Sequence, residues 1–334
     1  FAFRKLVYDC SQIVFKGFEI MPFVKKSFQA SSPTALFLFI MKNLGISQGE
    51  AQRLIHKGRA QKGEKILLDS GEKIEGEIAL TVFEPSESSR EEFRPIYKNR
   101  DFMIFDKPSG ILVHPNTHEA GYSMLDVVRW HGGNGANIAH RLDKETSGLL
   151  IAALHKKAEI ALKKAFENRA VQKEYLAWVS GEMKEDLSVT TRLKKSIDFS
   201  EDKHKVLITQ EEGKLSTTEF FPLFYDKELD ATLVRCVPKT GRMHQIRVHL
   251  FHVKHHILGD PIYGVDFSAA NRYLDGVLSE KERAYHTGAK RLMLHASKLD
   301  FRFEDEYFTF ESEIDFAKMQ ALITPLSQRE ESKY

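Results

Sequence analysis

The sequence predicts an α+β fold organised as a small N-terminal module and a larger body. Helical patterns at residues 124–130 and 156–168 interrupt the strands of the body without regular alternation, which favours a mainly antiparallel sheet over a doubly wound one. A chain of 334 residues is also long for one domain, so two modules are expected. The strand-like segments of the body lie at residues 102–105, 149–154, 173–179, 217–221, 231–237, 245–250 and 292–296.

The small module begins with a helical pattern at residues 33–44. A second helix is expected from Gln48 onward, because Ser47 and Glu50 have the spacing of a capping box. It should stop at Gly58, a residue that suits a helix C-terminus. Two short strands are expected after it, at residues 65–68 and 78–83. The prediction is a pair of helices on a small β-hairpin.

The limits of the modules follow from composition. A polar segment that contains Pro85 reads as a linker before the strand-rich part of the chain. The chain begins at Phe1, so its natural start is open, and Met21 is one candidate. The expected parts are an N-terminal extension of uncertain structure, the small module, the linker and the body, at residues 1–26, 27–84, 85–92 and 93–334.

Overall composition restricts the class of protein. Lysine and arginine number 49 against 47 acidic residues, so a nucleic-acid surface would have to be a local patch. Cys10 and Cys236 are far apart, which argues against a zinc ribbon and against a disulfide framework. The most apolar run, residues 35–41, is too short to cross a bilayer. We therefore expect a cytoplasmic monomer that has no membrane partner.

The most informative segment is His-Arg-Leu-Asp-Lys-Glu-Thr-Ser-Gly at residues 140–148, followed by an apolar run. It holds one carboxylate, Asp143, between cations and fixes it next to a core strand, where a reactive group can be held rigidly. Taken alone, the segment fits a solvated turn with a structural ion pair equally well. Two further segments, at residues 171–177 and 239–250, favour the reactive site.

These three segments, in this order, resemble the signature of the RluA/RluD family of RNA pseudouridine synthases. The matching motifs are His140-Arg141-Leu142-Asp143, Lys173-Glu174-Tyr175 and Thr240-Gly241-Arg242-Met243-His244-Gln245-Ile246-Arg247. With later matches at residues 259–264 and 291–296, the resemblance covers about residues 93–320. It implies the pseudouridine synthase fold, a long mixed, mainly antiparallel sheet with a central cleft. It also implies the isomerisation of uridine to pseudouridine in RNA.

The resemblance assigns roles to three residues as catalytic: Asp143, Tyr175 and Arg247. The reaction breaks the N1–C1′ bond, turns the uracil, joins C5 to C1′ and removes the C5 proton. Asp143 can attack C1′ or take a proton from C2′, and the sequence leaves both routes open. Arg247 is its expected partner, because a guanidinium lowers the pKa of a carboxylate and orients it. Tyr175 is expected to stack on the uracil and is a candidate base for C5, with core packing as the alternative.

The remaining candidates are expected to bind the substrate. A uridine in folded RNA must be flipped out, and Arg141 is the candidate for filling the vacated stack. His140 is expected to position the loop, and for His244 a purely structural role is equally open. Five histidines between residues 244 and 256 match no standard metal spacing, so no metal is expected. No cofactor is expected either. The other expected contacts are Lys173, Arg242 and Gln245, and for Arg242 and Gln245 the alternative is that they shape the strand expected to carry Arg247.

The small module resembles an S4 RNA-binding domain. Between residues 53 and 65 the only acid is Glu64. The cations of this stretch are Arg53, Lys57, Arg59, Lys62 and Lys65. Such a patch can neutralise phosphates but cannot read a sequence, and a solvated basic helix face is the alternative. An S4-like module on this body resembles members that act on ribosomal RNA, so large-subunit (23S) RNA is the expected substrate. A tRNA substrate, or a vestigial RNA-binding ribosome assembly factor, is the alternative.

Overall fold

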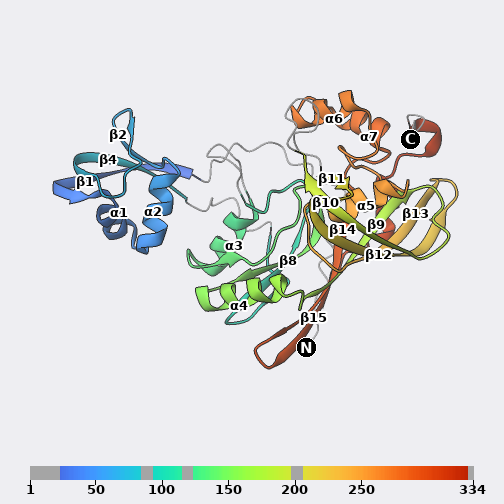
Figure 1. The fold of residues 1–334 in the computed structure, drawn as a ribbon, viewed down its shortest axis with the longest axis horizontal. Coiled ribbons are helices and arrows are strands. Elements are labelled where there is room, and N and C mark those ends of the chain that lie inside the picture. Colours follow the sequence, from blue (N-terminus) through green and yellow to red (C-terminus); the bar gives the residue numbers. More distant parts are fainter. Residues whose placement is uncertain (1–22, 84–92, 115–122, 197–205, 330–334) are drawn as a thin grey trace. The chain divides into compact units, whose positions relative to one another are not determined.

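The computed structural model describes two compact units, one before and one after the expected linker (Figure 1). The expected linker, residues 85–92, and most of the N-terminal extension, Cys10 included, lie outside the described residues. In the described part of the chain, no helix is both long enough and apolar enough to cross a membrane. The described residues are 23–83, 93–114, 123–196 and 206–329.

The small unit is a four-stranded antiparallel sheet, in the order β1-β4-β2-β3, with two helices. The prediction missed β1, which starts inside the segment left unassigned and includes the first residues of the predicted helix. It also missed β2, which lies between the two strands expected to form a hairpin, so β3 and β4 do not pair with each other. The polar residues of β1 show neither the periodic pattern of a helix nor that of a strand. Their extended conformation is set by pairing with β4. The elements are β1 (Phe23–Ala35), α1 (Leu36–Leu44), α2 (Gln48–His56), β2 (Ala60–Lys62), β3 (Lys65–Ile66) and β4 (Lys73–Phe83).

The two ends of α2 confirm the signals read from the sequence. The backbone N–H and the hydroxyl of Ser47 donate to Glu50 Oε2 at 3.0 and 2.6 Å. After the helix, Gly58 adopts φ 67° and its N–H donates to the Ile55 carbonyl at 2.8 Å. Only glycine reaches that backbone conformation without steric cost, so the helix ends there.

The large unit is built on an 11-stranded sheet in the order β11-β10-β12-β13-β9-β14-β8-β6-β5, with β15 on β14 and β7 on β8. Only the β14–β8 pair is parallel, so the predicted mixed, mainly antiparallel sheet is confirmed. Its strands are β5 (Tyr97–Lys98), β6 (Phe102–Lys107), β7 (Asn137–Ile138), β8 (Ser147–Ala153), β9 (Gln172–Ser180), β10 (Leu187–Lys195), β11 (Val206–Thr209), β12 (Lys214–Asp226), β13 (Ala231–Pro238), β14 (Leu294–Phe303) and β15 (Glu306–Glu311).

One predicted strand of the body is a helix. Residues 245–250 lie in α5 and not in a strand. The segment alternates polar and apolar residues, which is typical of a half-buried strand, yet all six residues are buried. Its polar side chains are satisfied by internal hydrogen bonds, so the alternation did not mark a solvent face. The helices of this unit are α3 (Met124–Gly132), α4 (Lys156–Glu167), α5 (Gln245–His252), α6 (Phe267–Leu274) and α7 (Glu280–Thr287).

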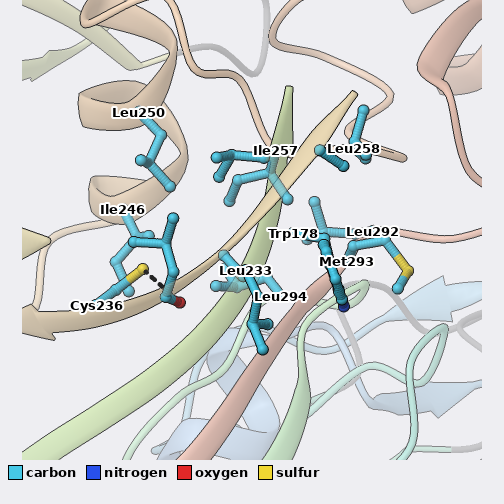
Figure 2. Packing of buried hydrophobic residues seen from close by; sticks show 14 of the residues in the cluster. Trp178, Leu233, Cys236, Ile246, Leu250, Ile257, Leu258, Leu292, Met293 and Leu294 are labelled. Carbon is cyan, nitrogen blue, oxygen red and sulfur yellow. Dashed lines mark hydrogen bonds between the residues drawn. The ribbon is translucent and has the colours of Figure 1, made fainter. Parts of the chain in front are cut away.

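The main core anchors α5 on the middle of the sheet. Ile246 and Leu250 of α5 belong to the same buried cluster as Cys236 and Leu233 of β13 and Trp178 of β9 (Figure 2). Burial of such side chains contributes about 1.5–3 kcal/mol each. Because α5 contacts β12 and β13 and shares this core with β9, the polar residues between Ile246 and Leu250 have fixed positions relative to the sheet.

A glycine makes the parallel pairing possible at the start of β8. Gly148 has φ 108°, and a Cβ there would lie 2.3 Å from the carbonyl oxygen of Ala296 in β14. Any side chain would therefore push the two strands apart. The Thr-Ser-Gly of the sequence motif is thus the point where the loop that carries Asp143 joins the sheet.

Candidate active site

All candidate residues of the body line one cavity of about 530 Å³. They come from three places: the loop before β8, strand β9, and the first turn of α5 together with the loop that leads into it. The remaining candidates, Arg53, Lys57 and Arg59, belong to the small unit. The residues brought together around the cavity are His140, Arg141, Asp143, Lys173, Tyr175, Arg242, His244, Gln245 and Arg247.

Asp143 and Arg247 form the predicted ion pair. Arg247 Nη1 lies 3.2 Å from Asp143 Oδ2. The arginine side chain is 3% exposed, whereas that of Asp143 is 27% exposed and open to the cavity. A carboxylate held from behind by a buried guanidinium keeps its remaining lone pairs for a substrate.

A second carboxylate, which the sequence analysis missed, holds Arg247. Asp260 Oδ2 and Oδ1 accept from Nε and Nη2 of Arg247 at 2.7 and 2.8 Å, and Asp260 is 1% exposed. Its Oδ1 also accepts the backbone N–H groups of Ile262 and Tyr263. Burial opposes the charged form, yet Arg247 and these N–H groups hold the pKa of Asp260 below its usual value. The Gly-Asp-Pro match at residues 259–261 was the available signal.

The loop that carries Asp143 is fixed by a buried lysine. Lys107 is fully buried, and burial lowers its pKa to about 7. Lys107 Nζ donates to the backbone carbonyls of Pro108, Ile111 and Lys144, at 2.8, 2.9 and 3.0 Å. The hydroxyl of Ser109 donates to the backbone carbonyl of Glu145 at 2.6 Å. Loss of either side chain would leave the backbone beside Asp143 with fewer hydrogen bonds to hold it.

His140 has the contacts of a positioning residue, as expected. Its Nε2 accepts the N–H of Ile151 at 3.1 Å, and its ring stacks on Phe166 at 4.4 Å. Burial, together with the charge of Lys173, lowers the pKa of His140 to about 3. The imidazole is therefore neutral at physiological pH and fixes the loop to β8 and to α4.

Gln245 uses its whole amide within the protein. Its Oε1 accepts the hydroxyl of Thr240 at 2.6 Å and the N–H of Arg242 at 3.0 Å. Its Nε2 donates to the Thr217 carbonyl and to the Thr218 hydroxyl, both at 2.9 Å. These four bonds tie the loop that carries Arg242 to β12, so the structure supports a positioning role and not a contact with RNA.

Tyr175 lies on β9, between β13 and β14, and two residues after Lys173 on the same face of the strand. Burial, and then the negative charge of Asp143, raise the pKa of Tyr175 well above its usual value. A tyrosine with a raised pKa is a still poorer base, so this environment favours a neutral phenol that stacks or donates a hydrogen bond.

Replacing Tyr175 with phenylalanine should therefore slow turnover by about tenfold without abolishing it, because one hydrogen bond is lost and the ring is kept. Leucine at the same position should cost more, because it also removes the stacking surface. Single-turnover rates of both variants on one RNA would test this. If the phenylalanine variant is as inactive as a variant lacking the Asp143 carboxylate, the hydroxyl does take a proton.

Four of the five histidines between residues 244 and 256 have hydrogen-bond partners within the protein. His255 Nδ1 and His256 Nδ1 bond to the carbonyl and the hydroxyl of Ser180. His244 Nδ1 bonds to the Tyr263 hydroxyl at 3.0 Å, and His244 Nε2 lies 3.7 Å from Asp143 Oδ2. In the part of the chain that the structure describes, no three His, Cys, Asp or Glu side chains gather as a metal site would require.

His249 should make stability depend on pH. Its ring is fully buried between the hydroxyls of Thr191 and Thr218, and burial lowers its pKa to about 4. The unfolded chain binds a proton at this histidine more tightly than the folded chain does. The contribution of neutral His249 to the free energy of unfolding is therefore present above about pH 6.5 and is lost as pH falls towards 4. Between pH 6.5 and 5 the loss should be about 2 kcal/mol. Denaturant unfolding of His249→Gln should show a correspondingly flatter pH dependence, and an unchanged slope would contradict this.

The cavity is cationic apart from Asp143 and Glu167. Arg141 is exposed, and its guanidinium has no hydrogen-bond or ion-pair partner in the described residues. Lys173 is partly buried, and burial lowers its pKa. Arg242 lines the same wall, with its Nε shielded from solvent and without a partner in the described residues. Such a wall suits an anionic ligand whose phosphates would satisfy these donors.

Comparison with known proteins adds independent findings. Residues 101–252 match the family model described as RNA pseudouridylate synthase. An RNA pseudouridine synthase of Helicobacter pylori, described as uncharacterized, is 34% identical over 87% of this chain and 94% of its own length. Ribosomal large subunit pseudouridine synthase C of Escherichia coli is 30% identical over 77% of this chain and 81% of its own length. Human RNA pseudouridylate synthase domain containing 1 superposes with a TM-score of 0.56 and 26% identity, over 73% of this chain and 91% of that one.

Proposed function

We propose that this chain, which belongs to the RluA/RluD family of RNA pseudouridine synthases and isomerises uridine in RNA, acts on large-subunit (23S) ribosomal RNA. Its catalytic residue in this proposal is Asp143. The observation that carries the assignment of Asp143 is its pairing with buried Arg247 in the wall of the cavity that all candidate residues of the body line. The E. coli relative, whose name refers to the large ribosomal subunit, supports the choice of RNA.

Asp143 must be ionised at the start of the reaction. It then either attacks C1′ or removes a proton from C2′, and both routes break the N1–C1′ bond. The second interaction of Arg247, with Asp260, keeps the guanidinium in place while the charge on Asp143 changes. The uracil turns within the cavity and C5 bonds to C1′, which breaks the Asp143–C1′ bond on the first route and returns a proton to C2′ on the second. C5 then loses its proton and N1 gains one, so the product is an isomer of the substrate. The reaction has no redox step and transfers no group from a donor.

The other residues of the cavity are assigned to binding the flipped nucleotide. Arg141 is exposed at the mouth, where its guanidinium plane can stack in the place that the uridine leaves. Lys173 and Arg242 are proposed to bind phosphates. Tyr175 is proposed to stack on the uracil as a neutral phenol.

Tritium release from C5-labelled transcripts tests the choice of RNA. The purified chain, acting on 23S RNA and on bulk tRNA in parallel, should release tritium from the 23S transcript only. A small number of equivalents per RNA would indicate site-specific action. Release from tRNA alone would overturn the ribosomal assignment and leave the catalytic one intact.

The small unit is proposed to bind RNA through phosphate contacts. Arg53, Lys57 and Lys62 are exposed on α2, on the turn after it and on β2, and Lys65 is paired with Glu72 at 2.7 Å. Replacing Arg53, Lys57 and Lys62 with glutamine should lower the slope of log affinity against log salt by roughly 2–3 units on long RNA. Turnover of a minimal stem-loop should stay the same. An unchanged slope would make this face an ordinary solvated surface.

A further inference from the structure

One arginine outside the family motifs connects both halves of the active site. Arg283 lies on α7, which follows α6 and contacts it; the two helices, both labelled in Figure 1, are called the helical hairpin below. Its Nη2 donates to Glu145 Oε2 at 2.7 Å and to the backbone carbonyl of Gly259 at 3.0 Å. The Arg283 side chain is 14% exposed and that of Glu145 is 10% exposed, so water competes little for these bonds.

The two acceptors are adjacent to the catalytic ion pair in the chain. Glu145 is two residues after Asp143, and Gly259 directly precedes Asp260, which binds Arg247 through two hydrogen bonds. We propose that Arg283 is a positioning residue for the isomerisation. It holds the loop that carries Asp143 and the loop that carries Asp260 in fixed relative positions, so that Asp143 meets Arg247. This inference rests on the proposed role of Asp143.

Glu145 has the environment of a fixed anchor. Besides Arg283, its carboxylate accepts the hydroxyl of Tyr273, from α6, at 2.9 Å. Burial opposes ionisation of Glu145, but Arg283 and then Tyr273 hold its pKa below the usual value. The carboxylate is thus charged, and both of its oxygens are bound to the helical hairpin. The backbone two residues from Asp143 cannot shift without breaking these bonds.

Gly259 offers Arg283 an equally fixed acceptor. It adopts φ 78°, and a Cβ there would lie 1.6 Å from the carbonyl oxygen of Arg291. Its N–H donates to the Thr287 carbonyl, at the end of α7, at 2.7 Å. The direction of the Gly259 carbonyl is therefore set by close packing. Arg283 binds both of these rigidly held acceptors, so the position of each loop depends on that of the other.

A purely structural ion pair would predict a different result from a positioning role. It would lower stability when removed but leave the turnover of each folded molecule intact. A positioning role predicts a loss of kcat, because a displacement of about 1 Å in a reacting group can cost about 100-fold in rate. The affinity for RNA should change little, since Arg283 is not among the residues that line the cavity.

The test compares Arg283→Ala with a control variant, Arg272→Gln. The control breaks an exposed ion pair between α6 and α7, in which Arg272 lies 2.6 Å from Glu282, and it leaves Glu145 untouched. At saturating RNA, Arg283→Ala should lower kcat by about 10- to 100-fold with RNA affinity unchanged, and added guanidinium should restore part of it. Arg272→Gln should stay within about twofold of the wild type. Wild-type kcat in Arg283→Ala, or a loss that only follows the folded fraction and resists guanidinium, would overturn the proposal.

A second variant covers the case in which Arg283→Ala does not fold. Glu145→Gln keeps the shape of the side chain but loses the charge and one of the two acceptor oxygens, which bind Tyr273 and Arg283 separately, and it should lower kcat by about 3- to 10-fold. Wild-type kcat in that variant would overturn the proposal as well. Asp143→Asn in the same assay separates the two levels of inference. If it is active, the proposed function itself fails; if it is inactive while the Arg283 and Glu145 variants are unimpaired, only the positioning role fails.

Discussion

Replacing Asp143 with asparagine should abolish product formation while leaving the fold and the affinity for RNA nearly intact. The amide keeps the shape of the side chain but can neither attack C1′ nor take a proton from C2′. Binding should even improve slightly, because a negative charge near the phosphates is lost. Tritium release from C5-labelled RNA measures turnover, and a filter-binding titration measures affinity.

Glu167, the other acidic side chain on the cavity wall, gives a matched control for Asp143. It is exposed and lies outside the Asp143–Arg247–Asp260 group, so Glu167→Gln should retain turnover within a few-fold. The two variants remove the same charge from the same cavity. Near wild-type turnover in Asp143→Asn, or equal losses in both variants, would remove Asp143 from the mechanism.

Replacing Arg247 with methionine should have the second large effect, on both turnover and stability. The substitution removes the partner of Asp143. It also leaves the carboxylate of Asp260 buried without its counter-charge. An uncompensated buried charge typically costs about 3–5 kcal/mol. The variant should thus lose stability as well as turnover. Denaturant unfolding measures the first effect and tritium release the second.

A double variant separates these two effects. Arg247→Met combined with Asp260→Asn removes the stranded charge but keeps an acceptor for the N–H groups of Ile262 and Tyr263. It should regain part of the lost stability and none of the lost turnover, because Asp143 still lacks its guanidinium. If turnover returns together with stability, Arg247 acts on the fold and not on the catalytic carboxylate.

The residues that gather at the cavity could be predicted from the sequence because they belong to short motifs. Asp143, Tyr175 and Arg247 lie on three separate segments, and the structure brings them to one cavity as expected. The ends of α2 could also be predicted, since Ser47, Glu50 and Gly58 act through local hydrogen bonds and backbone conformation. The mixed sheet followed from the irregular order of strands and helices.

The parts that escaped prediction depend on burial and on distant partners. Segment 245–250 alternates like a strand, and only the three-dimensional structure shows that its polar side chains are buried and satisfied in α5. Asp260, Lys107 and Arg283 act through contacts with residues of other elements. For Asp260 the Gly-Asp-Pro match was a signal, but nothing in the sequence around Lys107 and Arg283 distinguishes a buried, hydrogen-bonded charge from a solvated one.

Mapping pseudouridines in the RNA of cells that lack this protein tests the central claim most directly. Deletion should remove pseudouridine from one or a few positions of large-subunit ribosomal RNA and leave tRNA unchanged. A wild-type copy should restore these positions, and a copy carrying Asp143→Asn should not. Unchanged ribosomal RNA in the deletion strain, or restoration by the Asp143→Asn copy, would contradict the account.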